Sequence, residues 1–164
     1  MADLRGNPWS FATTDVAAST AITSITRNGA RSATVVSTAH GRAVGNLISI
    51  QGATPIQWNG GYTVQSVIDA NTFTIRIEDW RSSLANAGAA GNVLTLLYPD
   101  LIDVTQMLWD GPTTGGVLLV TDANGRTVWN PTAVTGGSLT YMKAFPVAGL
   151  VLNAMPTGVL QISI

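Results

Sequence analysis

Apolar and polar residues alternate along many short segments of the chain. Residues 62–67 read Tyr-Thr-Val-Gln-Ser-Val and residues 73–77 read Phe-Thr-Ile-Arg-Ile. A period of two places one set of side chains on each face of a β-strand, so one face is buried and the other meets solvent. This pattern predicts strands at residues 21–26, 32–38, 47–51, 62–68, 72–77, 93–98, 101–109, 117–121, 126–129, 139–145, 150–153 and 159–164.

Turn residues separate these segments and predict hairpins. Asn28-Gly29 suits the positive φ angles of a tight turn, and residues 69–71 and 122–125 carry similar Asp, Asn and Gly chemistry. Pro99 is expected to stop the strand before it, because proline cannot donate to a sheet. We expect an all-β protein with little helix: an extended arm (residues 1–20), a small β-barrel-like module (21–98) and a β-sandwich or jelly-roll-like module (99–164).

The first 20 residues admit two interpretations. A Gly-Asn-Pro turn at residues 6–8 precedes the aromatic residues Trp9 and Phe11. The segment is either a disordered terminus or an arm whose aromatic side chains dock on a neighbouring subunit. The sequence does not choose between them.

Charge is sparse in this chain. Charged residues make up 10% of it, with 8 Lys+Arg against 9 Asp+Glu, where an ordinary soluble domain has roughly 25%. The arginines are scattered rather than clustered, which argues against nucleic-acid binding. No stretch reaches the roughly 20 apolar residues that span a bilayer, so we expect no membrane association. A surface poor in charge but not made for lipid indicates contact with other protein, including copies of this chain.

Three sequence elements in the first module carry a resemblance. They are a His-Gly turn at His40-Gly41 that leads to a glycine and an apolar strand, then Asn59-Gly60-Gly61-Tyr62-Thr63-Val64, then Asn71-Thr72-Phe73. In this order, over residues 38–77, they resemble a small β-barrel module of bacteriophage virion proteins.

The second half resembles small β-sandwich modules of phage proteins. Leu108-Trp109 precedes Gly111-Pro112, a Gly-Arg-Thr-Val-Trp segment follows at residues 125–129, and an apolar strand lies at 159–164. Together the two resemblances imply a structural subunit of a virion, in the capsid decoration, neck or tail. They imply partners among its own copies and other virion proteins, location in the virion, no enzymatic activity and no cofactor.

The residues themselves offer little for catalysis or metal binding. His40 is the single histidine and sits in a turn, where an imidazole commonly binds the local backbone. Asp100, Asp103 and Asp110 lack the alternating ligands and closing Glu of an EF-hand, so capping roles are expected. The chain has no cysteine, and its Gly-Gly pairs lack the Lys-Ser/Thr of a phosphate loop. We expect no catalytic residue and no metal site.

Tryptophan is frequent, with five in the chain: Trp9, Trp58, Trp80, Trp109 and Trp129. Trp109 and Trp129 are expected in the core because each stands beside a turn and a strand. Trp58 lies in a predicted loop near Tyr62, where an exposed ring is either a subunit contact or a platform for a sugar. The candidate interface residues are therefore Trp9, Phe11, Trp58 and Tyr62, and the alternative function is a carbohydrate-binding module that holds surface glycans with loop aromatics.

Overall fold

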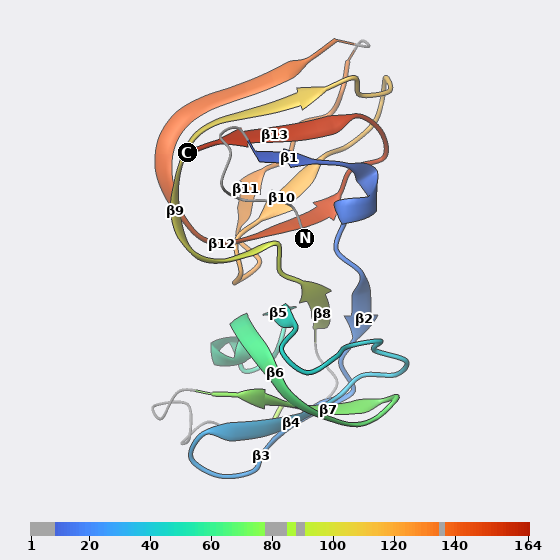
Figure 1. Cartoon of the computed structure of the whole chain (residues 1–164), viewed down its shortest axis with the longest axis vertical. Helices are drawn as coiled ribbons and strands as arrows, with labels where there is room; N and C mark the ends of the chain where they lie inside the picture. The colour runs from blue at the N-terminus through green and yellow to red at the C-terminus, as the bar shows by residue number, and fades with distance from the viewer. Residues whose placement is uncertain (1–8, 78–84, 88–90, 135–136) are drawn as a thin grey trace. The chain divides into compact units, whose positions relative to one another are not determined.

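The computed structural model describes residues 9–77, 85–87, 91–134 and 137–164, without the side chains at 15, 99, 100 and 143–145. Trp80 and most of the connection between residues 78 and 92 lie outside these ranges. The described residues form two antiparallel sheets and no α-helix, which confirms the all-β prediction (Figure 1). In this part of the chain no helix is long and apolar enough to cross a membrane.

Strands supply nearly all of the regular structure. The strands are β1 (Trp9–Phe11), β2 (Ser19–Ala21), β3 (Ser24–Arg27), β4 (Ser32–Val36), β5 (Leu47–Gln51), β6 (Gly60–Asp69), β7 (Thr72–Arg76), β8 (Asn92–Thr95), β9 (Tyr98–Asp110), β10 (Leu119–Thr121), β11 (Thr127–Trp129), β12 (Leu139–Ala154) and β13 (Val159–Ser163). Two single 3₁₀ turns, η1 (Thr13–Asp15) and η2 (Ile56–Trp58), interrupt them.

The chain divides into two compact units. Unit 1 contains Met1–Ala17, Leu97–Asp122 and Arg126–Ile164, and unit 2 contains Ala18–Leu96 and the short loop Ala123–Gly125. Each unit holds one of the sheets and one cluster of buried hydrophobic side chains.

Unit 2 is a curled seven-stranded sheet in the order β2-β8-β5-β6-β7-β4-β3. β2 and β3 stand at opposite ends of this order, yet only Ile22 and Thr23 separate them in the chain. The sheet must therefore curl until its two edges approach each other. Hydrogen bonds among the described strands do not close it into a barrel. The concave side buries a core that includes Ile25, Trp58 and Phe73, each 0% exposed.

Unit 1 is a six-stranded sheet in the order β1-β13-β9-β12-β10-β11. β12 pairs with β9 over most of its length, and its last residues pair with β10. The register between β12 and β9 shifts twice, once next to Gly149, which has a φ of +74°. Such bulges bend a strand, and β9 and β12 curve strongly in Figure 1.

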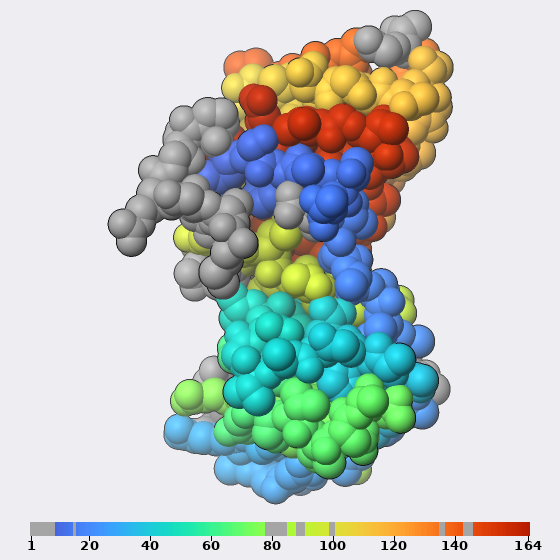
Figure 2. Space-filling model, turned by 45° about the vertical axis from the view of Figure 1, so that its right-hand side comes forward, coloured from blue at the N-terminus to red at the C-terminus, as the bar shows by residue number. Residues whose placement is uncertain are grey.

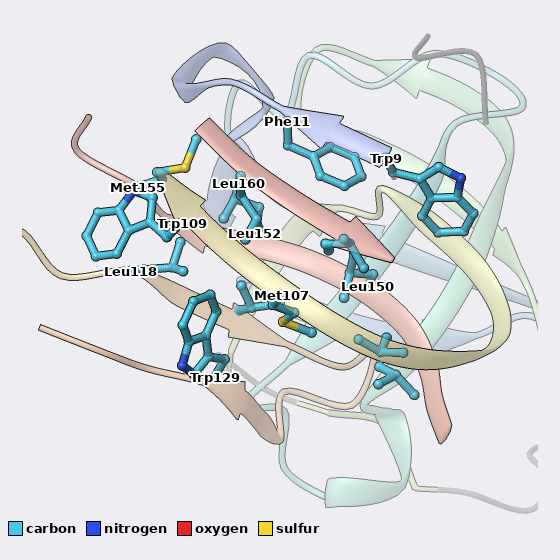
Figure 3. Packing of buried hydrophobic residues seen from close by; sticks show 14 of the residues in the cluster. Trp9, Phe11, Met107, Trp109, Leu118, Trp129, Leu150, Leu152, Met155 and Leu160 are labelled. Carbon is cyan, nitrogen blue, oxygen red and sulfur yellow. The ribbon is translucent and has the colours of Figure 1, made fainter. Parts of the chain in front are cut away.

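The curvature of β9 and β12 encloses the core of unit 1. Figure 3 shows the side chains of Phe11 and Leu160 on one side of this core and those of Leu118 and Trp129 on the other. Trp109 is 0% exposed, and its indole Nε1 donates to the carbonyl oxygen of Thr157 at 2.8 Å. Trp109 and Trp129 thus lie in the core, as their positions beside turns predicted.

Three local expectations differ from the structure. Residues 9–11, inside the expected arm, form β1 and pair with Leu160–Ile162 of β13. Pro99 does not stop a strand, because it lies near the start of β9 rather than at the end of β8. β12 continues through Pro146, where two strands were expected, and a register shift lies shortly before the proline.

Candidate functional site

His40 has a structural environment. It is 5% exposed, and its Nδ1 accepts the backbone N–H of Arg42 at 2.9 Å. Nε2 lies 3.0 Å from the carbonyl oxygen of Asp69, and since a carbonyl only accepts, Nε2 carries the proton. Phe73 packs edge-on against the ring at 4.8 Å. Both ring nitrogens are thus engaged by backbone, as expected for a turn histidine.

Arg42, two residues on, is the most buried cation with a described environment. Its Nη1 donates to Oγ1 of Thr95 at 2.7 Å, and its Nη2 donates to the carbonyl oxygens of Ala18 at 2.7 Å and Val93 at 3.2 Å. Desolvation by burial lowers the pKa of the guanidinium, which still stays charged at neutral pH. Arg42 therefore joins the His40 turn to the β2–β8 edge of unit 2 and offers little to a ligand.

The carboxylates whose side chains the structure describes do not assemble into a site. Asp103 and Asp110 are exposed and stand seven positions apart on β9. Oδ1 of Asp110 accepts the hydroxyl of Ser138 at 2.5 Å, and the side chain of Asp100 lies outside the description. Within the described ranges no group of three His, Cys, Asp or Glu could hold a metal ion.

The four aromatic interface candidates pack inside their own units. Trp9 and Phe11 are 5% and 4% exposed and belong to the core of unit 1, whereas Trp58 and Tyr62 are 0% and 6% exposed and belong to that of unit 2. Nε1 of Trp58 donates to the carbonyl oxygen of Ala85, and the Tyr62 hydroxyl donates to that of Trp58.

This burial corrects the expectation that Trp58 stands exposed in a loop. The indole is enclosed because η2, within the β5–β6 connection, carries it into the core of unit 2. A buried ring cannot stack on a sugar. An interface role for Trp9, Phe11, Trp58 and Tyr62 stays a prediction, but these side chains offer a neighbour very little surface.

The outer face of the unit 1 sheet is the best candidate for an interaction surface. We use this name for the exposed residues Ser10, Leu101, Asp103, Thr105, Asp110, Thr140, Met142, Pro146, Ala148 and Val159. Strand pairing places Leu101 opposite Ala148, and Met142 opposite Gln106. At the surface of this unit β1 lies beside β13 (Figure 2).

The outer face exposes apolar side chains and few charges. Leu101 is 69% exposed and Met142 is 75% exposed, and among the side chains that the structure describes the charged members of this face are Asp103 and Asp110. Isolated exposed apolar residues are ordinary, but several on one sheet face with so little charge are typical of a surface that meets protein. Sequence reasoning located the strands but did not single out this face, although the alternation in residues 101–104 carried the signal.

A groove of about 360 Å³ lies beside β11 in unit 1. It is lined by Asp122, Arg126, Thr127, Val128, Tyr141, Pro146 and Val147. The lining combines one carboxylate, one guanidinium and one aromatic ring with aliphatic carbon. None of these residues was singled out as a binding residue from the sequence, because they come from segments about 20 positions apart.

Comparisons of the chain with models of protein families, with curated proteins and with solved structures gave no match in any of the three.

Proposed function

We propose that the chain is a structural subunit of a bacteriophage virion, as a capsid decoration, neck or tail component. It acts through protein–protein assembly with its own copies and with other virion proteins, and it has no enzymatic activity and needs no cofactor. The observation that carries the proposal is the outer face of unit 1, where Leu101 and Met142 stand exposed and the charged residues among the described side chains are Asp103 and Asp110.

The physical reason lies in the cost of keeping such a face in water. Burying apolar surface contributes about 25 cal/mol per Å², and few charges on this face would have to lose their hydration on association. Charge depletion at the centre is the compositional mark of protein interfaces. We therefore expect a chain with 10% charged residues to have a lower free energy in an assembly than as a free monomer.

The finer fold belongs to the same proposal. The curled sheet of unit 2 serves as a small β-barrel-like module, and the bent sheet of unit 1 serves as a β-sandwich-like module. The resemblance of residues 38–77 and 101–164 to phage modules of these two kinds supports the assignment. The His40 turn and Arg42 hold the loop after β4 rigid, which suits a building block that works by shape.

Light scattering on the purified chain tests the assembly step. We expect a closed oligomer, or copolymerisation with a second virion protein, rather than a monomer at micromolar concentration. Quantitative mass spectrometry of purified phage particles then tests the location. Hundreds of copies per particle indicate capsid or tail tube, and about six or twelve indicate a ring in the neck or baseplate. A chain absent from the particles would contradict the proposal.

Carbohydrate binding through Trp58 has no support, because that ring is 0% exposed. A saccharide site elsewhere in the chain rests on a different observation, the groove beside β11.

A further inference from the structure

The groove beside β11 has a preorganised polar end. The backbone N–H of Arg126 donates to Oδ1 of Asp122 at 2.8 Å, and the N–H of Asp122 donates to the carbonyl oxygen of Arg126 at 2.9 Å. Gly125, with a φ of +83°, allows the chain to turn between them. Asp122 is 9% exposed and its carboxylate is held by the Arg126 N–H, while the exposed Arg126 side chain lines the same groove. One acceptor and one set of donors thus stand next to each other.

The other wall of the groove is aromatic and aliphatic. Tyr141 of β12 lies half-buried, with its ring centroid 6.0 Å from that of Trp129 at an interplanar angle of 40°. Pro146 and Val147 add aliphatic carbon from the same strand. The core below supports the Tyr141 ring, since this residue packs against the buried cluster of unit 1.

These features select a class of ligand by its chemistry. A pyranose carries adjacent hydroxyls, which need a donor and an acceptor side by side, and a face of C–H groups, which packs against an aromatic ring. Asp122 and Arg126 carry opposite charges at the same end of the groove, so this end favours a neutral ligand over an ion. A wholly apolar ligand would cost the nearly buried Asp122 carboxylate hydration without replacing it. The volume of about 360 Å³ falls near the lower end of the roughly 300–1,000 Å³ of ligand pockets, so the ligand is small.

We propose that the groove formed by Asp122, Arg126, Tyr141 and Pro146 binds a neutral saccharide of one or two rings. Tyr141 stacks on the C–H face of the ring, and Asp122 and Arg126 hold two neighbouring hydroxyls. This site goes beyond assembly: Asp122, Arg126 and Tyr141 lie outside the outer face, and Pro146 alone belongs to both surfaces.

Nuclear magnetic resonance titration of the full chain tests the site. The probes are glucose, galactose, mannose, N-acetylglucosamine and their common disaccharides, with sialic acid as the acidic comparison. We expect saturable amide shifts for at least one neutral probe, confined to residues 122–128 and 141–147, with millimolar affinity. Sialic acid should bind more weakly than the best neutral probe.

Substitutions distinguish binding in the groove from nonspecific binding of sugar to the protein surface. Tyr141→Ala should weaken binding at least tenfold, whereas Tyr141→Phe keeps the ring and should retain most of it. Arg126→Ala should weaken binding, and Arg76→Ala, at an exposed arginine in unit 2, should leave it unchanged. The amide spectrum of each variant reports whether it is folded.

Three results would overturn the proposal. The first is the absence of saturable shifts for every neutral probe at a concentration 50-fold above a dissociation constant of about 1 mM. The second is tighter binding of sialic acid than of any neutral sugar. The third is unchanged affinity in folded Tyr141→Ala. None of them bears on assembly, which light scattering measures without any sugar. Failure of this site and failure of the virion proposal are therefore distinguishable.

Discussion

Nη1 of Arg42 donates to Oγ1 of Thr95 at 2.7 Å, although 53 residues separate the two along the chain. The same guanidinium donates to carbonyl oxygens at Ala18 and Val93, on or beside strands β2 and β8. Its Nε is buried without a partner among the described atoms. Arg42 thus fixes the loop after the His40 turn to one edge of the curled sheet.

Replacing Arg42 should weaken unit 2. Arg42→Met removes three hydrogen bonds from a charged donor and leaves two carbonyls without this partner, at a cost of about 2–3 kcal/mol. Arg42→Lys should lose nearly as much, since an ammonium lacks the planar fork that reaches three acceptors. Urea unfolding followed by circular dichroism measures both. Arg76→Met, at an exposed position on β7, is the control and should cost less than about 0.5 kcal/mol. Equal losses at the two positions would contradict the role given to Arg42.

The hydrogen bonds of His40 predict its tautomer. Because the Arg42 N–H occupies Nδ1 at 2.9 Å, the neutral ring must carry its proton on Nε2 and donate it to the Asp69 carbonyl. Long-range ¹H–¹⁵N correlation spectra distinguish the two tautomers directly, and an Nδ1–H ring would contradict the geometry. His40→Phe keeps the packing against Phe73 but leaves the Arg42 N–H and the Asp69 carbonyl without the imidazole, so we expect about 2 kcal/mol of destabilisation.

The sequence predicted the strands well because period-two alternation and turn chemistry are local. The segment 47–51 matches β5, and the turn at Asp69–Asn71 forms as expected, with the Asn71 N–H donating to Oδ1 of Asp69 at 2.7 Å. β1 was missed because Trp9–Phe11 directly follows the Gly-Asn-Pro turn at residues 6–8 and was assigned to an extended arm. Pro99 and Pro146 led to wrong predictions of strand boundaries. For Pro146, a register shift in the 142–145 region breaks regular pairing before the proline, and a single sequence does not reveal such a shift.

The candidate sites were harder to predict, because they depend on which face of each strand is buried. The sequence suggested Trp58 as a surface residue, whereas η2 turns it into the core and its Nε1 reaches the Ala85 carbonyl at 2.9 Å. Nothing in the sequence indicates that Met142 is exposed, yet its exposed fraction is 75%. Tyr141 and Asp122 line the same groove although 19 positions separate them, and this is a tertiary relationship that local patterns do not show.

Substitutions at two glycines of unit 1 distinguish the cost of steric crowding from the cost of backbone strain. Gly158 (φ +89°) and Gly115 (φ +79°) both adopt left-handed conformations, but a Cβ at Gly158 would lie 2.3 Å from the carbonyl oxygen of Asp110, and one at Gly115 would meet nothing within 4 Å. Gly115→Ala should cost about 1–2 kcal/mol from its φ angle alone. Gly158→Ala should cost at least about 2 kcal/mol more, because backbone must move. Thermal unfolding of the two variants in parallel measures the difference, and equal melting temperatures would refute the predicted crowding.

The last prediction concerns the outer face of unit 1. Leu101→Lys and Met142→Lys place charges on positions that are 69% and 75% exposed, so neither should change the free energy of unfolding by more than about 0.5 kcal/mol. A lysine buried against a neighbour must lose its hydration, so the double variant should shift the oligomer toward monomer by at least tenfold in dissociation constant. Ile56→Lys is the matched control: Ile56 is 73% exposed but belongs to unit 2. Sedimentation velocity of the unsubstituted chain, the double variant and Ile56→Lys measures the oligomeric state. If the oligomer persists in the double variant but dissociates with Ile56→Lys, the contact lies on unit 2 instead. The comparison is informative because the substituted positions are about equally exposed and differ in which unit they occupy.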